Sequence, residues 1–248
     1  MPNKSMRAVR IKLTQQLASY RIPGSYVIRQ SFPLPPYSSV IGMIHAACGF
    51  TKYCDMRVSV QGNTSSSVSE PYTHYSFNNG ASYDKTRHNV MFDSAAHEGR
   101  TVGATRGMLH VELLTDVELL LHIVPTDPAM IETIAHGMLY PKHYLSLGRH
   151  EDIVRVDDVK IVELQDGDPD EGITLLYNAY VPINLADGPG TVYSLNKTFE
   201  TPNAKNKLKV RRWNEQIKTR LASKGATIED TPILIDVDNE KVYGVFLA

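Results

Sequence analysis

Nine histidines occur in the 248-residue chain, and some of them could act as a general acid or base. The best placed are His45, next to the apolar Ile44; His88, close to Lys85 and Arg87; and His143, next to Lys142. A His and a Lys beside a scissile phosphate can remove the 2′-hydroxyl proton and stabilise the charge of the transition state. These residues are therefore candidates for metal-independent RNA cleavage. The favoured interpretation is that they contact RNA without cleaving it or are ordinary surface residues.

Other kinds of chemistry lack their sequence motifs. Asp166, Asp168 and Asp170 alternate, but the Gly and the terminal Glu of a calcium loop are missing. No Gly-rich phosphate loop followed by Lys and Ser or Thr occurs, and neither GxSxG nor HExxH is present. The two cysteines, Cys48 and Cys54, are too few for a Cys-rich zinc site. We therefore expect no metal ion and no cofactor.

Charge is strongly segregated along the chain, although the formal net charge is only −1. Seven basic residues precede Asp55, which is the first acidic residue. Residues 151–171 hold nine acidic and two basic residues, whereas residues 197–224 hold nine basic and two acidic ones. This pattern favours a basic surface that binds nucleic acid. The alternative is that each charged run is a solvated face with no partner.

The first quarter of the chain predicts a strand, a loop and a helix. Residues 7–14 alternate between apolar and basic side chains, which is typical of a half-buried strand whose second face is basic. The proline-punctuated residues 20–37 cannot form a regular helix. A helix is then expected to begin at Ser38 or Ser39 as N-cap and to end at Gly49. A second strand is expected at 55–60.

The following segment predicts a projecting hairpin. Residues 61–106 are polar, rich in Gly, Ser, Asn and aromatics, and too long for a plain connection. We then expect strands at 108–113 and 117–124, joined by a turn at Thr115 and Asp116, and a helix from Asp127 to about Leu139. The element order indicates an α+β fold with helices on one face of a sheet, as in a ferredoxin-like domain.

The remainder predicts a smaller β-rich lobe, with strands near 159–164, 173–180, 233–236 and 242–247. The sequence is thus divided into residues 1–140, which hold the ferredoxin-like domain and its insertion, and residues 141–248, which hold a linker loop and the lobe. No apolar run approaches the roughly 20 residues that span a bilayer, and no secretory signal is evident. We therefore expect a cytoplasmic protein without membrane contact.

Two segments carry a resemblance to a known family. The stretch YRIPGSYVIRQSFPLPPYSSVIGMIHAACG (20–49) resembles a signature of the CRISPR-associated Cas-five family, the RAMP-type subunits of type I Cascade complexes. The stretch YPKHYLSLGRHEDIVRVDDVKIVEL (140–164) is similar to a second segment of that family. Together they cover about a fifth of the chain. The overall organisation looks most like the type I-B branch.

The resemblance implies both a fold and a function. Family members have a ferredoxin-like, RRM-related domain with an inserted thumb hairpin and a variable C-terminal β lobe. They bind the 5′ handle of the CRISPR RNA, cap the Cas-seven backbone and contact a large Cas-eight-type subunit, so that they reach target DNA through the complex. The insertion 61–106 would be the thumb. We therefore expect a non-catalytic RNA-binding subunit of a ribonucleoprotein complex that serves antiviral defence by DNA interference.

Two alternatives remain open at this point. Relatives of type I-C cleave precursor CRISPR RNA with a Tyr, Lys and His set, for which Tyr37, His45, Lys85 and His88 are the nearest candidates here. A metal-independent endoribonuclease is therefore the main alternative. A scaffold that does not bind RNA is the other.

The expected RNA-binding residues combine positive charge, stacking capacity and close backbone approach. Arg21 and Arg29 flank the loop before the first helix, whose N-terminus offers a phosphate site at Ser38 and Ser39. Gly148 would let the backbone approach RNA, with Tyr144 for stacking and Arg149 for phosphate. For each arginine the alternative is a surface salt bridge, and for Ser38 it is a simple helix cap. The full predicted set is Arg21, Arg29, Tyr37, Ser38, Ser39, Lys85, Arg87, His88, Arg106, Lys142, His143, Tyr144, Gly148 and Arg149.

Overall fold

A computed structural model describes residues 6–93, 101–168, 170–201, 211–229 and 231–248. The helices are α1 (Tyr37–Cys48) and α2 (Met130–Leu139). The strands are β1 (Met6–Ala18), β2 (Ile28–Arg29), β3 (Met56–Asn63), β4 (Ser66–Ser82), β5 (Val90–Asp93), β6 (Thr101–Pro125), β7 (Arg155–Asp166), β8 (Ile173–Thr174), β9 (Asn178–Pro182), β10 (Thr191–Glu200), β11 (Arg212–Ala222), β12 (Thr227–Ile228), β13 (Leu234–Asp238) and β14 (Lys241–Val245).

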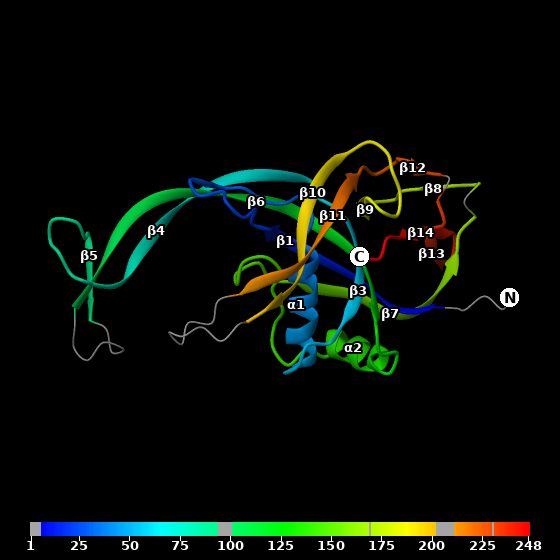
Figure 1. Cartoon of the computed structure of the whole chain (residues 1–248), viewed down its shortest axis with the longest axis horizontal. Coiled ribbons are helices and arrows are strands. Elements are labelled where there is room, and N and C mark those ends of the chain that lie inside the picture. Colours follow the sequence, from blue (N-terminus) through cyan, green and yellow to red (C-terminus); the bar gives the residue numbers. More distant parts are fainter. Residues whose placement is uncertain (1–5, 94–100, 169, 202–210, 230) are drawn as a thin grey trace.

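The centre of the fold is an antiparallel sheet with strand order β3-β6-β1-β7. Helix α1 connects β1 to β3 and helix α2 connects β6 to β7, so two β-α-β units interleave. Both helices lie on the same side of these strands (Figure 1). The α+β class predicted from the sequence is confirmed. Residues after 140 contribute β7 to this same sheet.

The main core forms between the helices and the sheet, because apolar residues alternate along β1. Val9, Ile11 and Leu13 are almost completely buried and pack in one cluster with Ile44 of α1 and Ile134 of α2. Removing such a side chain from water contributes about 1.5–3 kcal/mol. The predicted alternation of β1 therefore places its apolar face in the core.

Helix α1 begins and ends through different local chemistry. Its C-cap is Gly49 with φ of +67°, which confirms the predicted stop, since glycine adopts this left-handed conformation without strain. The expectation that Ser38 or Ser39 caps the N-terminus is wrong. The N-cap is Pro36, whose carbonyl accepts hydrogen bonds from the backbone N–H groups of Ser39 (2.9 Å) and Val40 (3.3 Å). Both serines lie half-buried in the first turn of α1.

Strand β6 is the longest element, with 25 residues. It runs through Thr115 and Asp116, so the turn predicted there is wrong. Strands β3 and β4 pair with β6 in one register, from Met56 opposite Pro125 to Phe77 opposite Ala104. Because partner strands continue on both sides of the expected turn, the ladder passes through it, and Asp116 adopts a φ of +49° within the strand. The outer part of this long hairpin, with β5, projects from the sheet at the left of Figure 1.

The second face of β1 is covered, contrary to the exposed basic face that its alternation predicts. Arg10 is only 1% exposed. Its Nη1 atom lies 3.0 Å from Asp236 Oδ2, and its Nη2 atom lies 2.9 Å from Asp238 Oδ2. His122, opposite Arg10 on β6, places its Nε2 atom 2.9 Å from Asp236 Oδ2. The basic side chain of Arg10 is therefore part of an internal network.

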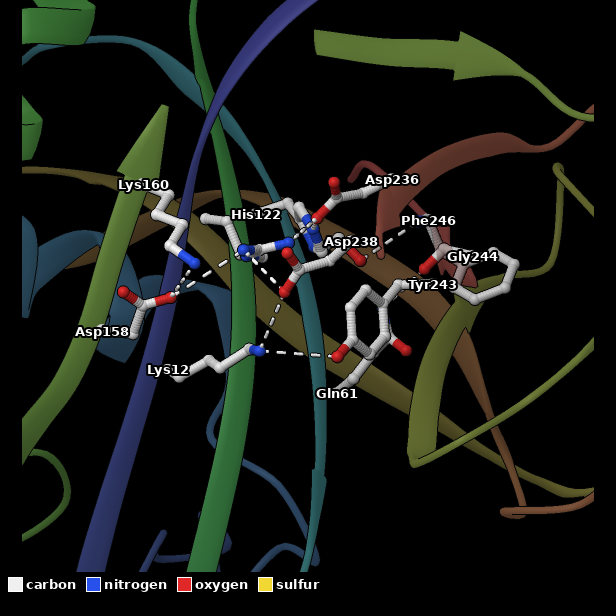
Figure 2. A network of polar contacts seen from close by, with 12 residues as sticks. Lys12, Gln61, His122, Asp158, Lys160, Asp236, Asp238, Tyr243, Gly244 and Phe246 are labelled. Atoms are coloured by element: carbon white, nitrogen blue, oxygen red, sulfur yellow. Dashed lines mark hydrogen bonds and ion pairs between the residues drawn. The ribbon is translucent and has the colours of Figure 1, made fainter. Parts of the chain in front are cut away.

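The C-terminal hairpin β13–β14 closes this network (Figure 2). Lys12 Nζ lies 3.4 Å from Asp238 Oδ2 and 3.4 Å from the Tyr243 hydroxyl. Gln61 of β3 donates to the Gly244 carbonyl at 2.6 Å, so the hairpin spans the sheet from β1 to β3. Figure 2 shows these side chains converging between the hairpin and the central strands.

Strands β9, β11 and β10 extend the sheet at β3, whereas β8 and β12 pair separately. The order continues β3-β9-β11-β10, and a second apolar cluster lies between these strands and the C-terminal segments. At the outer edge of β3, Ala248 exchanges two backbone hydrogen bonds with Val58. In the described parts of the chain, no helix is long and apolar enough to cross a membrane.

The neutral state of His122 makes the stability of the fold depend on pH. Burial lowers the pKa of His122, and the hydrogen bond to Asp236 only partly opposes this effect. His122 Nδ1 is buried without a hydrogen-bond partner among the described residues, so a proton there would be an unsatisfied donor. In the unfolded chain His122 gains a proton near pH 6.5. Below that pH the unfolded state binds more protons than the folded state, so His122 lowers the stability as the pH falls.

We therefore predict that the free energy of unfolding decreases more steeply with acidification in the wild type than in the variant His122→Gln. The difference should approach about 1.4 kcal/mol per pH unit below pH 6.5. Urea unfolding of both proteins at about pH 7.5 and about pH 5.5 measures it. Identical pH dependence in the two proteins would contradict a neutral buried His122.

Candidate nucleic-acid interface

The loop between β1 and α1 folds back on itself and brings two predicted arginines together. Arg21 forms an isolated antiparallel bridge with Ser31, and the Ile22 N–H donates to the Gln30 carbonyl at 2.8 Å. The returning arm of this loop is β2, which pairs in parallel with β6. Arg21 therefore lies on the outgoing arm and Arg29 on the returning arm, beside the base of the long hairpin.

The third arginine, Arg149, is fixed by a buried carboxylate. Asp152 is 1% exposed and accepts hydrogen bonds from the backbone N–H groups of Ser19 (2.9 Å) and Arg149 (2.8 Å). Its Oδ1 atom also lies 2.7 Å from Arg149 Nη2 and 3.0 Å from Arg149 Nε. Burial alone would lower the pKa of Arg149, but the hydrogen bonds and charge of Asp152 outweigh it and raise that pKa. This contact ties the loop 140–154 to the end of β1.

Gly148 has a structural role that differs from the predicted one. Its φ is +108°, and a Cβ atom there would lie 2.7 Å from Asp152 Oδ2 and 2.8 Å from the Ser19 carbonyl oxygen. The close backbone approach that only glycine permits is therefore made to the protein itself. Gly148 is exposed, so its predicted approach to RNA stays a prediction beside this structural role.

The three arginines Arg21, Arg29 and Arg149 line one pocket of about 150 Å³. Its other lining residues are Ser19, Glu70, Tyr72, Val111 and Glu151. We call this site the arginine pocket. It lies where the β1–α1 loop, the loop 140–154 and the strands β4 and β6 meet.

Arg29 and Tyr72 leave polar atoms available within the pocket. The Arg29 guanidinium carbon lies 5.0 Å from the centre of the Tyr72 ring, and its Nη2 atom lies 3.5 Å from His74 Nδ1. Arg29 Nε and the Tyr72 hydroxyl are both buried, and neither has a hydrogen-bond partner within the described ranges. An unpaired buried polar atom costs about 1–3 kcal/mol, so a ligand that pairs with these atoms would be stabilised.

The three arginines of the arginine pocket differ in how far they are already paired with carboxylates of the protein. Arg149 is held by Asp152 and also lies 3.1 Å from Glu151. Arg21 is exposed, and among the described residues its Nη2 atom reaches only the Ser25 carbonyl, at 3.5 Å. Arg21 and Arg29 are therefore the groups that can pair with an anion, whereas Arg149 mainly maintains the shape of the pocket.

Two of the predicted RNA-binding residues, Tyr37 and His88, are buried, so their prediction as RNA contacts is wrong. Tyr37 has no exposed surface, and its hydroxyl donates to Thr219 Oγ1 at 3.1 Å. Burial raises the pKa of Tyr37. His88 is 6% exposed, and its Nδ1 atom accepts a hydrogen bond from the Asp84 N–H at 2.8 Å. Both side chains stabilise the protein and neither presents a surface to RNA.

The other predicted residues lie outside the arginine pocket. Lys85, Arg87 and Arg106 are exposed on the outer part of the long hairpin, where Arg87 pairs with Asp84 at 3.0 Å. Lys142, His143 and Tyr144 are exposed on the loop after α2. Of these, Lys142 Nζ lies beside Gly49 at the C-terminal end of α1, where a cation is favourable. Tyr144 pairs with His150 through its hydroxyl at 3.0 Å.

The four candidate nuclease residues do not form one site. Tyr37 is in the core, whereas Lys85 and His88 belong to the connection between β4 and β5. Figure 1 shows β5 at the end of the projecting hairpin, far from α1. His45 Nε2 lies 3.3 Å from both the backbone N and O of Cys54, and the ring stacks on Tyr53 with centroids 5.5 Å apart. His45 thus holds the connection between α1 and β3.

Sequence reasoning missed the partners of the arginines. Tyr72 is recognisable as one aromatic of the long hairpin, but its place beneath Arg29 depends on the pairing of β2 with β6. Asp152 belongs to the GRHED segment, whose i,i+3 spacing from Arg149 is compatible with an ion pair. Lys205, Lys207 and Lys209 of the second basic run lie outside the described residues. In the part of the chain that the structure describes, no cluster of His, Cys, Asp or Glu could hold a metal ion.

Comparisons with known proteins place this geometry in context. A sequence profile described as "CRISPR-associated protein (Cas_Cas5)" matches residues 8–220. A comparison with curated protein sequences found no match. Among solved structures, a chain of a "CRISPR RNA-guided surveillance complex" aligns with a TM-score of 0.52 and 18% identity, covering 89% of this chain and 91% of its own. A CRISPR protein from Archaeoglobus fulgidus aligns with a TM-score of 0.47 and 13% identity over 98% of this chain and 100% of its own.

The two adjacent carboxylates that touch Arg149 provide a matched stability test. We predict that Asp152→Asn lowers the stability by about 3 kcal/mol, because it breaks a buried ion pair that also anchors two backbone N–H groups. Glu151 is 64% exposed at its side chain, so Glu151→Gln should change the stability by less than about 1 kcal/mol. Chemical denaturation of the two variants measures the difference. Equal effects would show that Asp152 does not anchor the loop.

Proposed function

The chain belongs to the CRISPR-associated Cas-five family, whose profile covers residues 8–220, and from this membership we propose that it is a non-catalytic RNA-binding subunit of a type I Cascade effector complex. In this proposal the arginine pocket holds the 5′ handle of the CRISPR RNA. The similarity of its organisation to the type I-B branch makes that subtype part of the proposal, and the cytoplasm is its place of action.

The observation that carries the proposal is the convergence of Arg21, Arg29 and Arg149. Arg21 and Arg29 come from the two arms of the β1–α1 loop and Arg149 comes from the loop 140–154, and all three line one pocket. Single-stranded RNA offers splayed bases together with phosphates, and guanidinium groups pair with the phosphates or stack on the bases. Glu70 and Glu151 in the same pocket can accept hydrogen bonds from base amino groups. A pocket with both kinds of group suits a nucleotide better than an isolated phosphate.

The assembly roles follow from the family resemblance. We propose that the interleaved β-α-β units are the ferredoxin-like, RRM-related RAMP domain and that the outer part of the long hairpin is the thumb. The subunit would cap the Cas-seven backbone, contact a large Cas-eight-type subunit and support recognition of target DNA through the complex. The outer hairpin exposes apolar side chains suited to such contacts, including Phe77 (60% exposed) and Met91 (59% exposed).

Endoribonuclease activity is the alternative function, and the positions of the candidate residues do not favour it. Tyr37 is buried and His45 is engaged with Cys54, while Lys85 and His88 belong to the outer hairpin. A general base must lie within hydrogen-bond reach of the proton it removes, together with its partner groups. The proposal therefore contains no catalytic step.

We predict that Arg29→Ala weakens binding of handle RNA by about tenfold and reduces the salt dependence by about 0.7 in the log–log slope, because one phosphate contact is lost. Arg155→Ala is the matched control, since Arg155 is exposed on β7 and paired with Asp157. Fluorescence anisotropy at several salt concentrations measures both quantities. Equal affinities and slopes for the two variants would contradict handle binding at the arginine pocket.

We also predict that the purified protein does not cleave labelled repeat RNA in the presence of EDTA. The variant His45→Ala should lose thermal stability, because His45 packs on Tyr53 and contacts Cys54, and should keep its affinity for handle RNA. Gel analysis of the RNA and thermal unfolding check these outcomes. Cleavage at the handle boundary by the wild type, lost in His45→Ala, would establish the endoribonuclease alternative.

A further inference from the structure

A second projecting hairpin, β10–β11, is firmly anchored at its base. Leu195 of β10 is completely buried. The Tyr193 ring packs edge-on against Phe32 at 5.7 Å and Tyr180 at 6.2 Å between ring centres. Thr219 of β11 accepts the hydrogen bond of Tyr37. These contacts fix the position of the hairpin relative to the main core.

The distal part of this hairpin presents an aromatic pair with an arginine. Phe199 and Trp213 are paired across the two strands, with ring centres 5.8 Å apart at 79°. The Arg211 guanidinium carbon lies 4.5 Å from the centre of the Phe199 ring. Phe199 is 42% exposed and Trp213 is 41% exposed, so both rings retain surface for a ligand.

The charge around this aromatic pair is positive. The carboxylates of the hairpin are balanced, because Glu200 lies 3.8 Å from Arg212 and Glu215 lies 3.6 Å from Lys197. Arg211 is exposed and takes part in none of the ion pairs found between described residues. The surface therefore complements a polyanion and would repel a basic partner.

We propose that Phe199, Trp213 and Arg211 form a stacking site for unpaired bases of single-stranded RNA, separate from the arginine pocket. An exposed indole or phenyl ring stacks on any base, and neighbouring cations pair with the phosphates. Paired bases hide their faces in the helix, so duplex RNA cannot use these rings. The choice of RNA over DNA rests on the proposed function, which already brings RNA to this subunit.

Trp213 is the only tryptophan in the chain, so its fluorescence reports directly on this site. We expect a single-stranded uridine RNA of about twelve nucleotides, which lacks the handle sequence, to quench this fluorescence in the full-length protein. A duplex of the same length should not quench it. A uridine oligomer that binds without quenching, or that does not bind folded protein, would overturn the proposal.

Variants separate stacking from charge and from folding. Measured by anisotropy of labelled uridine RNA, Trp213→Ala should weaken binding about tenfold, whereas Trp213→Phe keeps a stacking ring and most of the affinity. Arg211→Ala should lower the salt slope by about 0.7, and the exposed control Arg155→Ala should not. Circular dichroism verifies that each variant is folded. Equal affinities for Trp213→Ala and wild type would contradict stacking.

Further measurements test this site separately from the arginine pocket and test other ligands in place of RNA. Arg29→Ala should weaken handle binding but leave quenching by the uridine oligomer unchanged, so either site can fail alone. Quenching by a thymidine DNA oligomer but not by RNA would overturn the choice of RNA. Quenching by polyglutamate as strong as that by RNA would assign the surface to an acidic protein instead.

Discussion

Arg10 carries a positive charge into the middle of the sheet, and this charge determines where the end of the chain must lie. An unpaired guanidinium at that position would cost several kcal/mol. Its partner Asp236 is 226 residues away in sequence and comes from the C-terminal hairpin. The hairpin therefore lies across the face opposite the helices, with His122 donating to the same carboxylate. The contact between Ala248 and Val58 then follows from where β14 ends.

This pairing also changes how the basic run at the N-terminus is interpreted, because the sequence alone favoured a surface for nucleic acid. Three residues of the basic N-terminal run pair with carboxylates, because Arg7 contacts Glu132 at the surface, Arg10 contacts Asp236 in the interior and Lys12 contacts Asp238 at the edge of the same network. The segregation of charge along the chain thus serves contacts between distant segments as well as separate surfaces. The arginines that remain for a nucleic acid are those on loops outside β1, where loop backbone and side chains are free to meet a ligand.

Features set by local chemistry could be predicted from the sequence, and features set by distant partners could not. Gly49 ends α1 because its own backbone conformation allows it, and the alternation of β1 correctly identifies its core face. The same alternation cannot show that Arg10 is buried, since its partner is remote. Nor could the polar Thr115 and Asp116 be recognised as strand interior, because β3 and β4 hold them in register. Charge and position within the two matching segments singled out Arg21, Arg29 and Arg149, which do meet in one pocket. The same reasoning also selected Tyr37, which is buried in the core.

The continuity of β6 links the arginine pocket to the outer hairpin. One strand runs from the core to the projecting end, and its ladder with β3 and β4 keeps a single register from Pro125 to Ala104. The Ser65 N–H donates to the Thr115 carbonyl at 3.0 Å, which bridges the short gap between β3 and β4. Strand β2, which carries Arg29, pairs with the same β6. A nucleotide held by Arg29 would therefore have a fixed position relative to the hairpin, because both are attached to one hydrogen-bonded strand.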